Sequence, residues 1–169
     1  MKILETERTI LREVTKDDIE FILDLLNQPS FLRYIGDRNV RTVEQARDYI
    51  ESRLTASYRK FGFGMWAVEL KETDAPIGLC GFVKRDSLPE ADIGFAFLPQ
   101  FERKGYAFES ASAAMKYGGD VLNLNPVLAI TSKDNESSGR LLGKLNFKFE
   151  RLITLPGDVE ELKLFSSDL

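Results

Sequence analysis

Arg103 and Lys104 form a pair of adjacent cations directly before Gly105. An alternating pattern predicts a strand over 92–97 before this loop, and a run rich in small residues predicts a helix from about Tyr106 to Val121 after it. The first N–H groups of a helix have no partner within the helix and lie at its positive end. A glycine there lets the backbone approach a ligand closely. These residues predict an anion site, with phosphate as the expected guest, although an ordinary charged turn is the alternative.

The same loop resembles a known cofactor-binding motif. It is similar to the pyrophosphate loop of the GNAT N-acetyltransferase superfamily, which reads roughly Gln/Arg-x-x-Gly-x-Gly/Ala. Gly105 and Ala107 match this motif, whereas Glu102 stands where Gln or Arg is commoner. The resemblance implies that the guest is the pyrophosphate of acetyl-CoA. The residues expected to bind it are Arg103, Lys104, Gly105, Tyr106, Ala107 and Phe108.

A second segment, residues 135–147, resembles the GNAT pattern Asn-x-x-Ala/Ser-x-x-Leu-x-Glu-Lys-Leu-Gly-Phe. Asn135 and Ser138 fall in register with it. Leu142 occupies the place where many relatives carry a tyrosine as general acid, and the RimJ/RimL branch commonly lacks that tyrosine as well. Asn146 replaces the usual glycine after the helix. Asparagine tolerates the left-handed conformation better than most residues, so this position is expected to have a positive φ.

The beginning of the chain resembles the RimJ/RimL ribosomal-protein acetyltransferase branch, on Arg8 through Arg12, Asp17-Asp18 and residues 31–36. In that branch this region helps to wall the acceptor pocket. With all these segments the resemblance covers nearly the whole chain. It implies one GNAT domain over 1–169, of class α/β (α+β). Its mixed, mostly antiparallel sheet would contain a central parallel, splayed strand pair, flanked by helices.

Periodicity and turn residues predict the individual elements without help from the resemblance. Besides the strand and helix around the anion loop, strands are expected over 7–14, 65–70, 77–83, 127–131, 147–154 and 160–165. Further helices are expected from Thr15 to near Asn27, from Thr42 to about Ser57, and from Asn135 to Leu145. The first of these is expected to end before Pro29, because proline disfavours a helical residue before it.

The reaction that the resemblance implies is direct attack of an amine on the thioester of acetyl-CoA, the acetyl donor. Phe95, Ala96 and Phe97 are expected to line the acetyl and pantetheine arm. Backbone donors near Phe97, left free by the splayed strands, would polarise the carbonyl. Asn135 is carried over as a contact of the cofactor or of the thiolate.

Three side chains are candidates for acid–base or leaving-group roles. Asp92 and Glu90 precede the splayed part of the strand and are expected to point the same way, so that they could share a water. Asp92 is the favoured base, because it is expected to lie closer to the donors near Phe97. Ser138 is a candidate partner of the leaving thiolate. The alternatives are solvent-facing strand-end charges for Asp92 and Glu90 and a helix-surface hydroxyl for Ser138.

The composition excludes several kinds of chemistry. The chain of 169 residues has no histidine and one cysteine, Cys80, so Ser-His-Asp catalysis, histidine zinc sites and internal disulfides are ruled out. No metal is expected, and Cys80 is predicted to be a core residue. The net charge of −4 argues against nucleic acid as a partner. No apolar run suggests a signal peptide or a membrane span, so a cytoplasmic protein is expected, either monomer or homodimer.

Two other functions compete with the enzyme. A degenerate domain of the same family could bind acyl-CoA without catalysis, as a sensor. A different nucleotide-binding domain is disfavoured, because the loop lacks Gly-x-x-x-x-Gly-Lys-Ser/Thr. The acceptor amine is left open among protein N-termini, amino acids, polyamines and drug-like amines.

Overall fold

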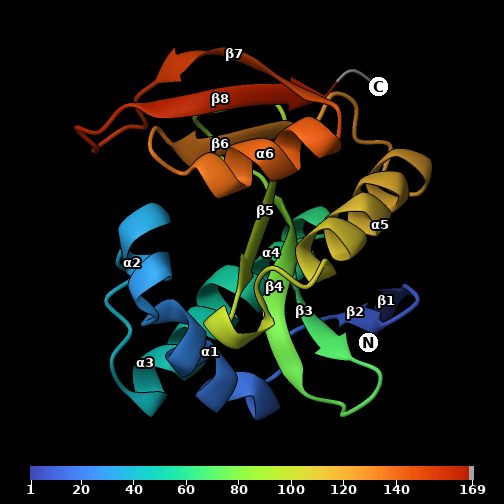
Figure 1. Ribbon diagram of the computed structural model, residues 1–169. Helices are drawn as coiled ribbons and strands as arrows, with labels where there is room; N and C mark the ends of the chain where they lie inside the picture. Colours follow the sequence, from blue (N-terminus) through green and yellow to red (C-terminus); the bar gives the residue numbers. More distant parts are fainter. Residues whose placement is uncertain (168–169) are drawn as a thin grey trace.

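The chain forms one eight-stranded sheet with helices on both faces (Figure 1). The computed structural model describes residues 1–167, and its strands lie in the order β1-β2-β3-β4-β5-β6-β8-β7. The strands are β1 Lys2–Glu5, β2 Thr9–Arg12, β3 Met65–Leu70, β4 Pro76–Val83, β5 Asp92–Phe97, β6 Leu128–Ser132, β7 Phe147–Ile153 and β8 Leu162–Ser167. Neighbouring strands are antiparallel except β5 and β6, which are parallel. The predicted mixed sheet is confirmed.

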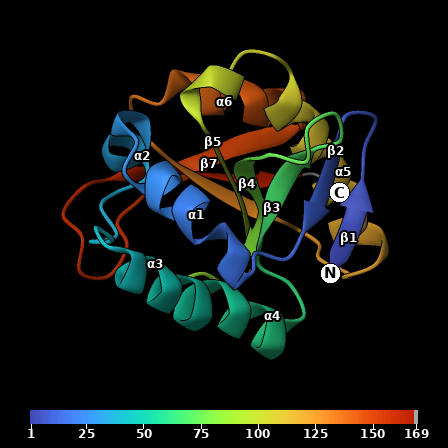
Figure 2. The same ribbon diagram turned by 90° about the horizontal axis from the view of Figure 1, so that it is seen from below.

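The helices form two groups, one on each face of the sheet. The first group stacks together as Figure 2 shows, and consists of α1 Ile19–Leu26, α2 Pro29–Tyr34, α3 Val43–Tyr49, the π-helix η2 Ile50–Thr55 and α4 Ala56–Phe61. The second group consists of α5 Tyr106–Asp120 and α6 Glu136–Lys144. Two short 3-10 turns, η1 Lys16–Asp18 and η3 Pro99–Phe101, complete the fold. No helix within residues 1–167 has the length and apolar character needed to cross a bilayer.

Each group of helices covers its own apolar cluster, because successive side chains of a strand point to opposite faces. On the α5–α6 face, Trp66 and Phe82 pack edge to face at 5.9 Å and lie in one cluster with Ala111 and Leu142. On the other face, Ala67 lies in a cluster with the buried residues of α1 and α3. The sheet therefore separates the α5–α6 side of the molecule from the α1–α4 side.

The parallel pair β5–β6 is joined at one end only. Asp92 is level with Leu128, and the N–H of Leu128 donates to the carbonyl of Ala91 at 2.9 Å. No further register pair joins the two strands within residues 1–167, although both continue for four residues or more. A gap therefore opens between them toward the ends at Phe97 and Ser132, as the splayed pair of the prediction requires.

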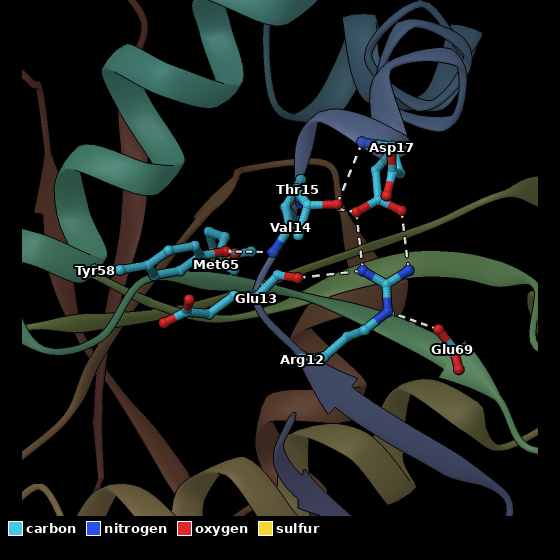
Figure 3. A network of polar contacts seen from close by, with 9 residues as sticks. Arg12, Glu13, Val14, Thr15, Asp17, Tyr58, Met65 and Glu69 are labelled. Atoms are coloured by element: carbon cyan, nitrogen blue, oxygen red, sulfur yellow. Dashed lines mark hydrogen bonds and ion pairs between the residues drawn. The ribbon is translucent and has the colours of Figure 1, made fainter. Parts of the chain in front are cut away.

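A charged corner fixes the passage from β2 to α1 (Figure 3). The Nη1 and Nη2 atoms of Arg12 each donate to the carboxylate of Asp18 at 2.9 Å, and its Nε donates to Glu69 at 2.6 Å. The carboxylate of Asp18 also accepts from the N–H of Thr15, which completes a capping box at the predicted start of this helix. These hydrogen bonds, first of all those to Asp18, raise the pKa of Arg12, so the corner keeps its charge.

The structure adds two elements that the sequence did not predict and extends a third. The edge strand β1 was missed, since a four-residue edge strand has too little alternation to be recognised. The first predicted helix does end before Pro29, at Leu26, but the short helix α2 was not predicted. Pro29 is its first residue, a position that suits proline because its missing N–H is not needed there. The helix from Thr42 continues past Ser57 to Phe61 through the π segment η2.

Candidate active site

The predicted anion loop joins β5 to α5 at the open end of the β5–β6 gap. Arg103 and Gly105 both have positive φ, at 61° and 86°, which turns the chain sharply into the helix. Gly105 is the N-cap of α5, and no side chain caps the helix there. The first N–H groups of α5 are thus left for an external partner, and Arg103 and Lys104 are exposed beside them. This arrangement suits a phosphate group.

The inner wall of the gap is the backbone of β5. The N–H of Leu98 donates to the carbonyl of Ile77 at 2.9 Å, so Leu98 and every second residue before it bond to β4. Phe95 and Phe97 alternate with them and direct their backbone groups toward β6, where the pairing has ended. Their side chains pack on the α5–α6 face, while Ala96 packs on the α1–α4 face. The gap therefore offers backbone donors of the kind that an extended amide-containing arm requires.

Asp92 lies at the closed end of the gap, where β5 is paired with β6. Its side chain is 2% exposed, and its two oxygens accept from Nε and Nη2 of Arg85 at 2.9 and 3.3 Å. Burial raises the pKa of Asp92, and the charge of Arg85 works against that rise. Glu90 is half-buried, and within residues 1–167 it makes neither a hydrogen bond nor an ion pair. Asp92 thus has Arg85 as its partner, and its role as a base is still a prediction.

Asn135 and Ser138 lie together at the start of α6. Asn135 is the N-cap, and its Oδ1 accepts from the backbone N–H of Ser138 at 3.2 Å. Both residues are half-buried. The Oδ1 of Asn135 therefore orients the helix start, and its amide nitrogen and the hydroxyl of Ser138 are the groups that a ligand could use.

Two shallow depressions flank these elements. One, of about 600 Å³, lies beside the first turns of α5 and includes Gly105 and Phe108 in its wall, together with Arg8 from the β1–β2 turn. The other, of about 530 Å³, lies between the β4–β5 and β7–β8 loops and includes Arg85 and Asp158. Neither runs into the gap, so neither alone defines the site.

Sequence reasoning gave no role to two residues that the structure brings to this region. Arg8 was noted only as part of the family resemblance, yet its Nη1 donates to the carbonyl of Lys104 at 3.1 Å. Thr131 is a strand residue, as predicted, and the structure shows in addition that its buried hydroxyl lies on β6, the strand that borders the gap. The sequence shows that Arg8 is a basic residue near the first predicted strand. It does not show that Arg8 lies beside the loop around Gly105.

The comparisons with known proteins agree with this geometry. The family described as "Acetyltransferase (GNAT) domain" matches residues 8–148. The chain is 35% identical over 152 residues to the uncharacterised N-acetyltransferase YoaA of Bacillus subtilis, covering 89% of this chain and 85% of that protein. It is 28% identical over 142 residues to spermidine N(1)-acetyltransferase of Escherichia coli, covering 83% of this chain and 73% of that protein.

Among solved structures, apo RimL, a ribosomal-protein alpha-N-acetyltransferase, superposes with a TM-score of 0.83 at 16% identity, covering 100% of this chain and 94% of that chain. RimL in complex with coenzyme A, held by a disulfide to a cysteine, gives a TM-score of 0.76 at 15% identity, with 98% and 97% covered. The fold and the loop after β5 define a GNAT-type N-acetyltransferase, and the chain belongs to that family. Within the family it is of the RimJ/RimL type.

Proposed function

We propose that this enzyme transfers the acetyl group of acetyl-CoA to a primary amine, either a protein N-terminus or a small-molecule amine such as a polyamine. The observation that carries the proposal is the gap between β5 and β6, which opens at the uncapped start of α5. Ribosomal-protein and spermidine acetyltransferases among the similar proteins support this range of acceptors.

Acetyl-CoA supplies an acyl group that is already activated, so the protein has to bind, orient and polarise. The first N–H groups of α5 would hold the pyrophosphate, with Arg103 and Lys104 adding charge. The N–H groups of Phe95 and Phe97 would hydrogen-bond the arm and the thioester carbonyl, stabilising the negative charge that develops on its oxygen.

The need for a base depends on the acceptor. An α-amine has a pKa of about 8, so roughly a tenth of it is neutral near pH 7. A lysine amine, at about 10.4, is less than a thousandth neutral and needs more help. In this proposal Asp92 or Glu90 takes the proton, and Ser138 hydrogen-bonds the leaving thiolate. The raised pKa of Asp92 brings this carboxylate closer to the range in which a base works well.

A turnover screen tests the proposal. Purified protein is incubated with acetyl-CoA and either N-terminal peptides or polyamines, and the free thiol of coenzyme A is followed. Turnover on one of these amines is expected, with the acetylated product identified by mass spectrometry. Binding of acetyl-CoA without turnover on any amine would instead favour the sensor, and no binding would remove the proposal altogether.

A further inference from the structure

Two hydroxyls are buried at the end of β6, those of Thr131 and Ser132, in side chains that are 8% and 3% exposed. Ser132 has the carboxylate of Asp134 nearby, and after Arg33, the larger cause, it helps to lower the pKa of that group. Thr131 Oγ1 has no hydrogen-bond partner within residues 1–167. Native proteins seldom leave a buried hydroxyl unpaired, because the group has lost its water and gained nothing in return. The Thr131 hydroxyl, beside a gap in the sheet, therefore points to a ligand.

The two hydroxyls lie on opposite faces of the sheet. Ala129 belongs to the cluster under α5 and α6, and Thr131, two residues further, shares its face. Leu128 and Ile130 belong to a separate cluster on the opposite face of the sheet. Ser132 alternates with Thr131 and so lies on that opposite face as well. Thr131 is therefore on the side of the sheet from which α5 and its loop approach the gap.

Thr131 also lies at a defined depth in the gap. The strands run parallel from the pair Asp92–Leu128, so Thr131 is level with Phe95, roughly 10 Å beyond the closed end. Phe95 directs its backbone N–H into the gap at this level. If the phosphates of coenzyme A bind at the loop around Gly105, its pantetheine arm enters the β5–β6 gap from the open end. The sulfur end of the arm then lies deepest in the gap.

We propose that the Thr131 hydroxyl hydrogen-bonds the sulfur of coenzyme A within the β5–β6 gap. This inference rests on the proposed function, because it takes acetyl-CoA as the occupant, and it adds Thr131 to Ser138 as a second donor to the sulfur. In the transfer, the amine nitrogen bonds to the carbonyl carbon, and the carbon–sulfur bond breaks with its electron pair on sulfur. The nitrogen gives one proton to a base or to water. Thr131 transfers no proton, and its O–H donates to the sulfur as negative charge develops there, which strengthens that hydrogen bond.

The ionisation of bound coenzyme A tests this contact without turnover. Coenzyme A is bound at saturation, and its thiolate absorbance is followed against pH in the wild type, Thr131→Val, Thr131→Ser and Ser132→Ala. A hydroxyl that donates to the thiolate lowers the pKa of the thiol. Thr131→Val is therefore expected to raise the pKa of bound coenzyme A by about one unit, a tenfold change in ionisation. Thr131→Ser and the control Ser132→Ala should match the wild type.

Equal pKa values in the wild type and Thr131→Val would overturn the inference while leaving the proposed function intact. Failure of the wild type to bind coenzyme A would overturn both.

A proximity test uses thiol–disulfide exchange with the symmetrical disulfide of coenzyme A. A thiolate at the substituted position attacks it, forming a mixed disulfide and releasing one coenzyme A thiolate. Thr131→Cys is expected to gain one coenzyme A in the intact mass, faster than Ser132→Cys, and Cys80 adds little because it is fully buried. Equal labelling of the two variants, or none in Thr131→Cys, would overturn the placement.

Discussion

Arg8 and Glu109 tie the turn between β1 and β2 to the first turn of α5. Arg8 Nε donates to Glu109 Oε1 at 2.8 Å, and the backbone N–H of Arg8 donates to Oε2 at 2.9 Å. The Arg8 guanidinium lies 4.3 Å from the centroid of the Tyr106 ring. Partial burial alone would raise the pKa of Glu109, but hydrogen bonds from Thr6 and Arg8 lower it, so the carboxylate stays charged. The pair thus holds the loop from both sides of Gly105.

Arg8→Met should weaken acetyl-CoA binding without direct contact with the ligand. The variant keeps an unbranched apolar stem and the backbone hydrogen bond to Glu109. It loses the two side-chain hydrogen bonds to Lys104 and Glu109, so the loop is less well ordered. The dissociation constant should rise about tenfold or more, because two hydrogen bonds of a charged group are lost. Calorimetric titration measures it, with Glu7→Gln, an exposed neighbour, as the control. Identical affinity in both variants would show that Arg8 does not position the loop.

Gly105→Val should abolish tight binding of coenzyme A. Gly105 has φ of 86°, and a Cβ there would lie 3.1 Å from Nη2 of Arg8. A branched side chain would also stand at the mouth of the anion site. Gly157→Val is a matched control, because Gly157 has φ of 84° and open space around it in the β7–β8 loop. If both variants bind coenzyme A as the wild type does, the loop is not the cofactor site.

Asn146 adopts the predicted left-handed conformation, with φ of 67° after α6. Asn146→Gly should be neutral or slightly stabilising, because glycine takes this conformation without strain. Asn146→Val should lower the free energy of unfolding by about 1 kcal/mol or more. Urea denaturation of the two variants measures the difference, and a valine variant as stable as the glycine variant would contradict it.

Asp92→Asn should lower kcat by about a hundredfold if this carboxylate is the base, with little change in the affinity for acetyl-CoA. The base works in its charged form, so kcat/KM should rise with pH through the pKa of Asp92, which burial raises above its usual range. The variant should lose this rise.

Two further variants separate the candidates for the base. Asp86→Asn, an exposed neighbour, should keep the wild-type profile. Arg85→Ala should move the rise to higher pH, because it removes the partner that stabilises the charged form. Full activity of Asp92→Asn together with loss in Glu90→Gln would transfer the role to Glu90, and activity in both variants would leave no dedicated base.

The Cys80 thiol should be inert in the folded protein. Cys80 is fully buried, and burial raises the pKa of its thiol to about 12. Thiol reagents at about pH 8 should therefore label it only after unfolding, and labelling should quicken as the pH rises toward that value. The native state holds the proton more tightly than the unfolded state, so stability should fall as the pH rises from 9.0 toward 12. Rapid labelling of the native protein would contradict the buried position.

The sequence alone determined the features whose cause is local. The turn at Gly105, the helix starts at Thr15 and Thr42, and the positive φ of Asn146 depend on the conformation of a few adjacent residues. The types of those residues were therefore enough to predict them. Two motifs in the right order also predicted the family and its mixed sheet. Pro29 shows the limit of such local prediction. A proline can follow the end of one helix or begin the next one, and the residue type does not say which.

Only the tertiary structure decided which distant residues meet. Arg8 and Glu109 are 101 positions apart, and Arg85 reaches Asp92 through a loop whose path no periodicity records. The burial of the Thr131 hydroxyl depends on where β5 stops pairing with β6. Strand register and strand divergence follow from the packing of α5 and α6 against the whole sheet, and packing of that kind is a property of the folded chain, not of any short segment.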